Sequence, residues 1–180
     1  MAVVVAACGA DQTATPTTPT TTPTSTTAPP PATPTTTTGA VTPSGFAVTP
    51  ARITLADGTV CELCLWEAAT APQRQRGLMG ATDLGDADGM VFVYGAERSS
   101  AFWMRDTPLA LDIAWFDAGG AFISSATMVP CLSGPDSGCA RYGAAAPFTA
   151  AVELPAGRLE ALEVGPGSVL ALAAGRGCDD

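Results

Sequence analysis

The expected fold depends on one stretch of the sequence, which reads Ala51-Arg-Ile-Thr-Leu-Ala56, then Asp57-Gly58, then Thr59-Val-Cys-Glu-Leu-Cys-Leu-Trp-Glu67. An Asp-Gly pair between two apolar-rich runs is a strong signal for a tight β-hairpin turn, because glycine adopts the backbone angles that such turns need. The residues on either side of the pair therefore predict two antiparallel strands. This hairpin indicates a β-rich domain, so we read the rest of the chain for further strands.

The rest of the domain continues the pattern of short strands and turns. Two short helices are expected, one at 71–79, where Thr70 is a suitable N-cap and Pro72 suits the first turn, and one at 155–162. Short strands with turn signals every 8–12 residues predict a mainly β (α+β) fold, a compact antiparallel barrel or sandwich of about 7–8 strands with two short helices. The further strands are expected at 89–94, 101–104, 111–116, 121–128, 148–154 and 168–172.

The N-terminus resembles the lipobox of bacterial lipoproteins. Residues 1–8 read Met-Ala-Val-Val-Val-Ala-Ala-Cys, so that the small apolar triplet Val5-Ala6-Ala7 directly precedes Cys8, the expected lipidation site. The basic and long apolar regions of a complete signal peptide are missing. We interpret residues 1–8 as a truncated signal peptide whose true start lies upstream; the alternative is an ordinary short apolar N-terminus.

Residues 9–45 differ in composition from the rest. Most of this segment is Thr, Pro, Ala and Ser, and Asp11 is the only charge between residues 11 and 44. Such a composition buries too little apolar surface to fold, which predicts a disordered Thr/Pro-rich linker. Residues 46–180 form the expected single globular domain, held outside the cytoplasm as a membrane-anchored lipoprotein at the cell surface or as a secreted protein.

The cysteines suggest disulfides, which persist in oxidising compartments. Cys131 and Cys139 bracket a short loop that can bring them together. Cys61 and Cys64 lie on one expected strand, too far apart to bond to each other, and we favour a Cys64–Cys178 bridge because strand alternation places Cys64 on the face opposite Cys61. Cys61 is then expected to be a small buried apolar residue. A four-thiolate zinc site and a redox Cys-x-x-Cys motif are the weaker alternatives.

Composition narrows the possible chemistry. The chain has a net charge of −9, eight basic residues that are all arginines, and no histidine. The absence of histidine removes histidine-based catalytic triads and histidine-ligated zinc sites. An acidic surface without lysine repels phosphate backbones, so nucleic acid is not an expected partner. We expect no cofactor and no metal, and a monomer that contacts the membrane through its lipid.

The densest group of functional candidates lies at 102–113, Phe-Trp-Met-Arg-Asp-Thr-Pro-Leu-Ala-Leu-Asp-Ile, and in the helix upstream. Arginine side chains can hold a carboxylate or phosphate in a bidentate contact, or can pair with nearby aspartates. The two aspartates of this stretch can be structural partners, ligand contacts or an acid/base pair. The candidate ligand-binding residues are Arg74, Arg76, Trp103, Arg105, Asp106 and Asp112.

Two further residue types have alternative interpretations. Thioethers suit Cu(I), although methionine more commonly fills cores. Aromatic residues can form a sugar-stacking surface, although in alternating strands half of them are expected in the core. The methionines are Met79, Met90, Met104 and Met128, and the aromatic residues are Phe102, Trp103, Trp115 and Phe116.

Six blocks, in order, carry a family resemblance. They are RQRGLMG at 74–80, GMVFVY at 89–94, FWMRDT at 102–107, LDIAWFD at 111–117, MVPC at 128–131 and VELPAG at 152–157. With them the chain resembles, from about residue 52 to 172, the bacterial and archaeal family called domain of unknown function 192. The resemblance implies a small, largely β fold and no particular activity. Arg105 stands where lysine is common in the family, and Cys61 is additional.

Two functions from different classes follow from the sequence. The first is a non-enzymatic envelope module that binds a small ligand, a glycan or an envelope partner. The second is a hydrolase or transferase of cell-wall polymer, which needs Asp106 and Asp112 to open into one cleft about 5–10 Å apart. We favour the first, because no nucleophile with a histidine or lysine base is available.

Overall fold

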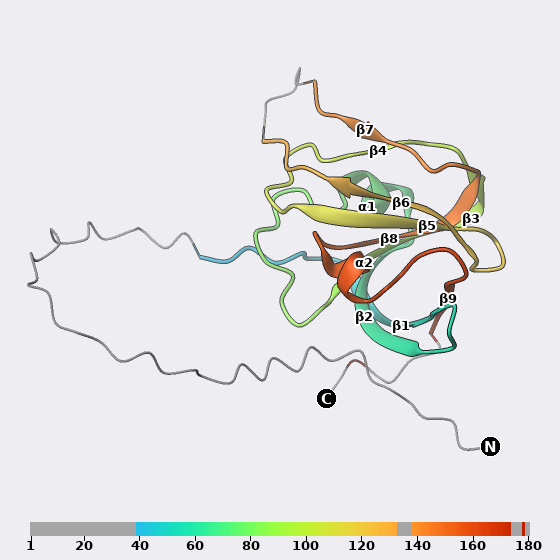
Figure 1. The fold of residues 1–180 in the computed structure, drawn as a ribbon. Coiled ribbons are helices and arrows are strands. Elements are labelled where there is room, and N and C mark those ends of the chain that lie inside the picture. The colour runs from blue at the N-terminus through green and yellow to red at the C-terminus, as the bar shows by residue number, and fades with distance from the viewer. Residues whose placement is uncertain (1–38, 133–137, 174–177, 179–180) are drawn as a thin grey trace, which may run out of the picture. The chain divides into compact units, whose positions relative to one another are not determined.

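The computed structural model describes residues 39–132, 138–173 and 178. Within these residues the fold is mainly β, with nine strands and two short helices (Figure 1). The predicted strands at 89–94, 111–116, 121–128, 148–154 and 168–172 are all present. In chain order the elements are β1 Ala47–Thr54, β2 Val60–Ala68, α1 Ala71–Arg76, β3 Gly89–Arg98, β4 Phe102–Trp103, β5 Leu111–Phe116, β6 Phe122–Met128, β7 Arg141–Tyr142, β8 Phe148–Pro155, α2 Arg158–Ala161 and β9 Val169–Leu172.

The β1–β2 hairpin forms where the Asp57-Gly58 pair predicts it. The strands are antiparallel, with Thr54 opposite Val60 at the closed end. Gly58 has a φ of 88°, a left-handed conformation that an L side chain rarely adopts. The backbone N–H of Leu55 donates to the Thr59 carbonyl at 2.8 Å, which closes the turn.

Seven of the strands form one strongly curved sheet in the order β6-β5-β8-β3-β2-β1-β9. All neighbouring pairs are antiparallel except β2 and β3, which run parallel and are connected through α1. The edges β6 and β9 approach each other only at their ends, where Ala121 forms an isolated bridge with Val169. The sheet is therefore not closed, so of the two expected architectures the structure is sandwich-like and not a barrel.

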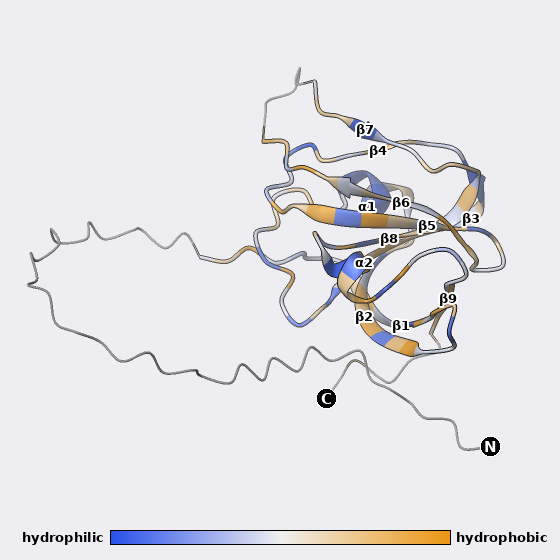
Figure 2. Cartoon of the chain, viewed as in Figure 1, coloured by the Kyte–Doolittle hydropathy of each residue, from blue (hydrophilic) through white to orange (hydrophobic). Residues whose placement is uncertain are grey.

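Two apolar cores lie on opposite faces of this sheet. The inner core fills the curve and includes Ile53, Leu65, Phe116 and Val152, with Leu159 of α2 at its open side. The outer core covers β3, β5 and β8 beneath α1 and a second, two-stranded sheet of β4 and β7. Figure 2 shows apolar residues concentrated along the central strands, as expected for a sheet buried on both faces.

The first helix begins at the predicted cap. The Gln73 backbone N–H donates to the Thr70 hydroxyl, and the Gln73 side chain accepts from the Thr70 backbone N–H at 3.0 Å, which is a capping box. The helix ends at Arg76, three residues earlier than expected, because Gly77 has a φ of 48°. The second helix covers only Arg158–Ala161.

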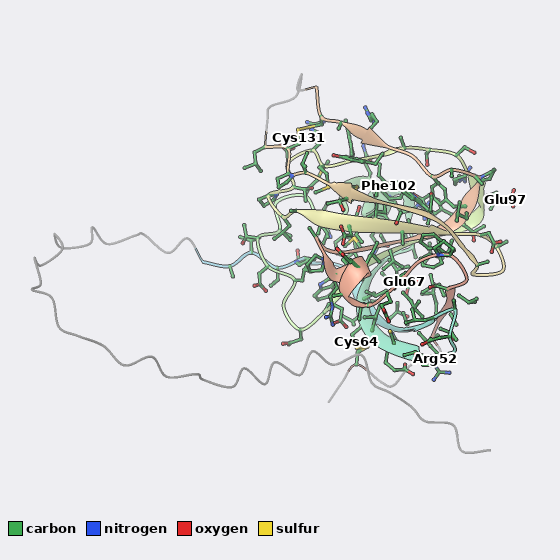
Figure 3. All side chains as sticks on the ribbon, in the orientation of Figure 1. Arg52, Cys64, Glu67, Glu97, Phe102 and Cys131 are labelled. Atoms are coloured by element: carbon green, nitrogen blue, oxygen red, sulfur yellow. A yellow bond between two sulfur atoms is a disulfide. The ribbon has the colours of Figure 1, made fainter. Side chains whose placement is uncertain are left out.

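Both predicted disulfides are present, Cys64–Cys178 and Cys131–Cys139. Figure 3 shows Cys64, a residue of β2, and Cys131 at opposite ends of the domain, so the two bridges secure different parts of it. Cys61 is fully buried on the face of β2 that it shares with Leu63, as predicted. It is also disulfide-bonded, which corrects the expectation of a simple apolar side chain. The disulfides are consistent with an extracytoplasmic location.

Several segments differ from the expectation. The strand expected at 101–104 is reduced to β4, which pairs with the unexpected β7 through Phe102 and Tyr142. Residues 41–45, assigned to the linker, contact the domain: Val41 exchanges hydrogen bonds with Thr82. The expected signal peptide, Cys8 and the linker up to residue 38 lie outside the described residues. No helix in the described part of the chain is long and apolar enough to cross a membrane.

Candidate functional site

A small cavity lies in the outer core, between α1 and the central strands. Its volume is about 40 Å³, room for about two or three water-sized atoms. Three of the predicted candidates, Arg74, Arg76 and Trp103, line it. Glu153 of β8 also lines it, together with apolar and small polar residues: Leu78, Met79, Phe92, Phe102, Met104 and Thr107.

Glu153 is the unusual residue of this cavity. Its side chain lies on the outer face of β8, opposite Met90 of β3 and Ile113 of β5, and only 5% of the residue is exposed. It makes no hydrogen bond or ion pair with the described residues. Burial raises the pKa of the Glu153 carboxyl to about 8, because the charged form loses its hydration. A buried acid without a partner is costly, which marks this position as a candidate site.

The two helix arginines are occupied by the domain itself. Arg74 donates to the backbone carbonyls of Ala69 and Val93, the latter at 2.9 Å, and its guanidinium lies 4.7 Å from the Tyr94 ring centre. Arg76 donates to the Ser44 carbonyl and stacks on Phe46 at 4.4 Å. These contacts hold the N-terminal segment and β3 against α1. Both guanidinium groups are therefore held in place by the domain itself, and both keep their positive charge at the cavity.

Trp103 is the exposed member of the aromatic group. It is 36% exposed, whereas Phe102, Trp115 and Phe116 are buried, so three of the four aromatic residues, not the expected half, belong to the core. The guanidinium of Arg141 in β7 lies 4.3 Å from the Trp103 ring centre, and that of Arg105 lies 5.5 Å away. The ring is thus covered in part by two arginines that come from different segments.

Arg105 and Asp106 flank this surface as a pair. Arg105 Nε lies 3.3 Å from Asp106 Oδ2, and Nε is buried without a hydrogen-bond partner among the described residues. Asp106 has a φ of 52°, and its backbone carbonyl accepts from the Gly80 N–H at 2.7 Å. Neither residue lines the cavity, so the two candidates sit beside it.

Asp112 lies on the other side of the sheet. It is 4% exposed, and its Oδ1 accepts from the Thr127 hydroxyl at 2.8 Å. Its Oδ2 accepts from the Leu159 backbone N–H at 3.2 Å. No arginine pairs with Asp112 among the residues that the structure describes, contrary to the expected ion pair. Since Asp106 belongs to the outer layer, the two aspartates are separated by the sheet, and the geometry gives no support to an acid/base pair.

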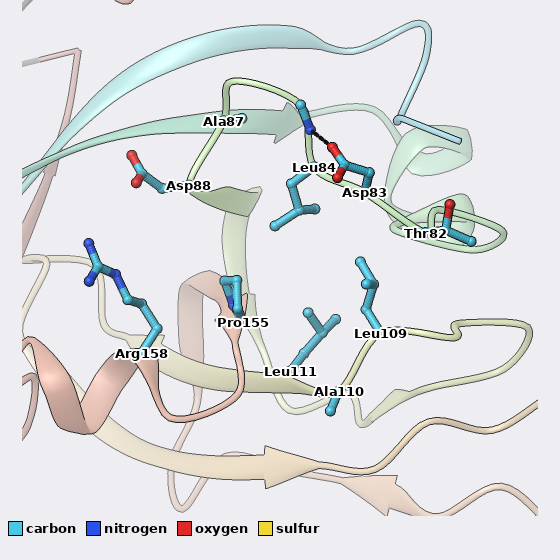
Figure 4. Close-up of a pocket in the computed structure, with 11 residues that line it drawn as sticks. Thr82, Asp83, Leu84, Ala87, Asp88, Leu109, Ala110, Leu111, Pro155 and Arg158 are labelled. Carbon is cyan, nitrogen blue, oxygen red and sulfur yellow. Dashed lines mark hydrogen bonds between the residues drawn. The ribbon is translucent and has the colours of Figure 1, made fainter. Parts of the chain in front are cut away.

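A second hollow, larger and more open, lies at the ends of β5 and β8 (Figure 4). Its volume is about 440 Å³, within the range of small-molecule sites. Leu84 lies across it from Leu109 and Leu111, with Pro155 in the wall and Arg158 at one end. None of the predicted candidates lines it.

The two aspartates of this open pocket accept hydrogen bonds from the backbone, whereas its arginine has no ion pair among the described residues. Asp88 Oδ2 accepts from the Cys64 N–H at 2.8 Å, and Asp83 Oδ1 accepts from the Gly85 N–H at 2.6 Å. Arg158 has no ion pair within the described part of the chain. The arginine is therefore the charged group most available to a ligand.

Sequence reasoning missed both Glu153 and Arg158. A signal was present for the first, since Glu153 is the only charge in the apolar run Phe148 to Leu154. For Arg158 no local signal existed, because the pocket is assembled from the 82–88 loop, β5 and α2. No cluster of three or more His, Cys, Asp or Glu side chains suited to a metal occurs in the described residues.

Comparison with known proteins gives the family. The sequence model of the family DUF192, which is described as an uncharacterised conserved region, matches residues 53–172. The chain belongs to this family. A solved structure from Sinorhizobium meliloti 1021, described as a candidate transcription regulator, is 29% identical with a TM-score of 0.64, covering 75% of this chain and 98% of that one.

A second solved structure is similar to this chain over the same extent. This protein of unknown function from Novosphingobium aromaticivorans DSM 12444 is 26% identical with a TM-score of 0.61, covering 75% of this chain and 94% of that one. No curated protein matches the chain. The family and its similar structures therefore define a fold and leave the function open.

Proposed function

We propose that this protein is a non-enzymatic binding module of the cell envelope that takes a small ligand in the open pocket beside Arg158. The observation that carries the proposal is the pocket itself: a hollow of about 440 Å³ with leucine side chains in its wall and, at its end, an arginine that forms no ion pair with any described residue. Sites for small molecules commonly combine an apolar lining with a few polar groups that orient the ligand.

The contacts favour a ligand with an apolar body and an acidic group. Leu84, Leu109 and Leu111 offer apolar surface, while the guanidinium of Arg158 can bind a carboxylate in a bidentate contact. Asp83 and Asp88 each accept a backbone N–H, and neither forms an ion pair with Arg158 in the described part of the chain. The enzymatic alternative has no comparable support, because Asp112 serves as a structural acceptor.

A thermal-shift screen of the full chain against small carboxylic acids tests this function. We expect hits that stabilise the wild type but not Leu109→Trp, in which the larger side chain fills the pocket. The affinity of Arg158→Gln for the same compounds should be at least about tenfold lower. Arg52→Gln is the matched control, because Arg52 pairs with Glu62 on the β1–β2 hairpin, away from the pocket. Absence of any hit, or hits that Leu109→Trp leaves unchanged, would overturn the proposal.

The place of action is the second part of the proposal. The lipobox-like run before Cys8 supports a lipid anchor, and the disulfides are consistent with an oxidising compartment. Mass spectrometry of Cys8 in the membrane fraction tests the anchor. A diacylglycerol thioether on Cys8 supports it, whereas an unmodified Met1 or a disulfide at Cys8 contradicts it.

The similar Sinorhizobium protein is described as a candidate transcription regulator, but we do not propose that role for this chain. A net charge of −9 without lysine opposes association with a phosphate backbone. Measurable binding to double-stranded DNA at about 0.15 M salt would reverse this view.

A further inference from the structure

Four of the eight arginines of this acidic chain gather at one place, the small cavity between α1 and the central strands. Arg74 and Arg76 line the cavity, and so does Trp103. The guanidinium groups of Arg141 and Arg105 lie 4.3 Å and 5.5 Å from the centre of the Trp103 ring. In a chain with a net charge of −9, this cluster is a local concentration of positive charge, which attracts anions.

The arginines of this cluster keep N–H groups that a ligand can use. Among the described residues, Arg74 donates to carbonyls only through Nη1 and Arg76 only through Nη2. Because a guanidinium carries N–H groups on every nitrogen, Nε and the second Nη of both side chains remain available. Arg105 is paired with Asp106, but the exposed side chain of Arg141 forms no ion pair or hydrogen bond with any described residue.

The buried side of the cavity supplies a matching donor. Glu153 is 5% exposed, lines the cavity and makes no hydrogen bond or ion pair with the described residues. Burial raises the pKa of its carboxyl to about 8, so at neutral pH this group is mainly uncharged and can donate to the oxygen of an anion. Glu153 is the only acid among the described residues that line the cavity, so the lining itself does not repel an anion.

Size decides which anion fits. The volume of about 40 Å³ suits a carboxylate group and is too small for a phosphate or a sugar ring. Arg76 and Trp103 in the wall are exposed, whereas Phe102, Met104 and Glu153 are buried, so the cavity opens to solvent on the arginine side. The remainder of a ligand whose carboxylate enters the cavity must therefore lie at this exposed rim.

We propose that the cavity and its rim bind a small dicarboxylate. One carboxylate enters the cavity and accepts hydrogen bonds from Arg74, Arg76 and the Glu153 carboxyl. The other stays at the rim, where it meets the free guanidinium of Arg141. No covalent bond forms or breaks. The site is separate from the open pocket, whose leucine wall suits a ligand with an apolar body.

Isothermal calorimetry of the full chain with succinate tests this site. The buffer contains no carboxylate or phosphate and is held at about pH 6.5, where Glu153 keeps its proton. We expect succinate to bind more tightly than acetate, and the neutral analogue succinamide not to bind. Arg76→Gln and Arg141→Gln should each lower the affinity for succinate at least about fivefold. Both arginines are exposed, so these variants leave the core intact.

Arg52→Gln and Arg158→Gln are the matched controls. Each removes the same charge elsewhere, since Arg52 pairs with Glu62 on the β1–β2 hairpin and Arg158 lines the open pocket. Both variants should bind succinate as tightly as the wild type. Glu153→Gln keeps a donor N–H and should retain the affinity, whereas Glu153→Leu removes the donor and should lower it. Thermal unfolding establishes that each variant is folded.

The proposal is overturned by the absence of succinate binding to the wild-type chain, by undiminished binding to both Arg76→Gln and Arg141→Gln, or by an equal loss in Arg52→Gln. Acetate that binds as tightly as succinate would contradict the second contact at the rim. A loss confined to Arg158→Gln would place succinate in the open pocket, which would support the proposed function and overturn this inference. Failure here therefore leaves the proposed function standing.

Discussion

The carboxylate of Asp112 on β5 holds the first turn of α2 through the backbone N–H of Leu159, at 3.2 Å. The N-cap residue of α2 is Gly157, which has no side chain to cap the helix. Asp112 therefore supplies from a neighbouring strand the acceptor that a capping side chain normally provides. This contact gives the buried aspartate a structural role.

Substitution of Asp112 should follow that role. Asp112→Ala leaves the Leu159 N–H without an acceptor and should lower the free energy of unfolding by about 2–3 kcal/mol. Asp112→Asn retains one oxygen for Leu159, while its amide can donate to the Thr127 hydroxyl, so the loss should be below about 1 kcal/mol. Urea unfolding measures both, and equal losses would contradict the structural role.

Glu153 should make stability depend on pH. The pKa of its carboxyl is raised by burial to about 8 in the folded chain, so the folded state holds a proton that the unfolded state releases above its ordinary pKa. The unfolding free energy should therefore fall as pH rises from about 5 to about 8. Arg74 and Arg76 line the same cavity as Glu153, and burial raises the pKa of the nearby Tyr94, which keeps its hydroxyl uncharged in this window.

Glu153→Gln supplies the comparison. The amide has no charge to bury. The unfolding free energy of this variant should therefore stay level between about pH 5 and pH 8, where that of the wild type falls. Thermal melts between pH 5 and 8 provide the measurement. Parallel curves for the two chains would show that Glu153 is already ionised when buried.

Gly89 is required by the close approach of β8. A Cβ at this position would lie 2.1 Å from the Glu153 carbonyl oxygen and 2.7 Å from a methyl carbon of Leu154. Gly89→Ala should therefore destabilise the domain by at least about 2 kcal/mol. Gly95→Ala, in the same strand with nothing within 4 Å, should be neutral or slightly stabilising. Similar unfolding free energies for the two variants would be inconsistent with this packing.

The Cys64–Cys178 and Cys131–Cys139 disulfides should contribute unequally to stability. Cys64–Cys178 closes a separation of 114 residues and Cys131–Cys139 one of 8. On the chain-entropy account, loss of the long bridge costs about 4–5 kcal/mol and loss of the short one about 2–3 kcal/mol. Double serine variants compared by urea unfolding test this order. A larger loss from the short bridge would mean that folded-state contacts, and not loop closure, dominate.

Local signals in the sequence determined much of the fold. The Asp57-Gly58 turn, the Thr70 cap and the alternation that places Cys64 opposite Cys61 each depend on neighbouring residues, so they could be predicted without knowing the rest of the chain. The two disulfides followed from the same reasoning. The short β4–β7 pair was missed because two-residue strands carry no periodicity.

Only the tertiary structure decided which candidates meet. Alternation tells which residues share a side of one strand, but the order β5-β8-β3 decides which side faces which core. That order places Asp112 against α2, on the face opposite the one where Glu153 lines the cavity beside α1. Pairing of strands far apart in sequence is fixed by burial of the whole sheet, which no local pattern encodes.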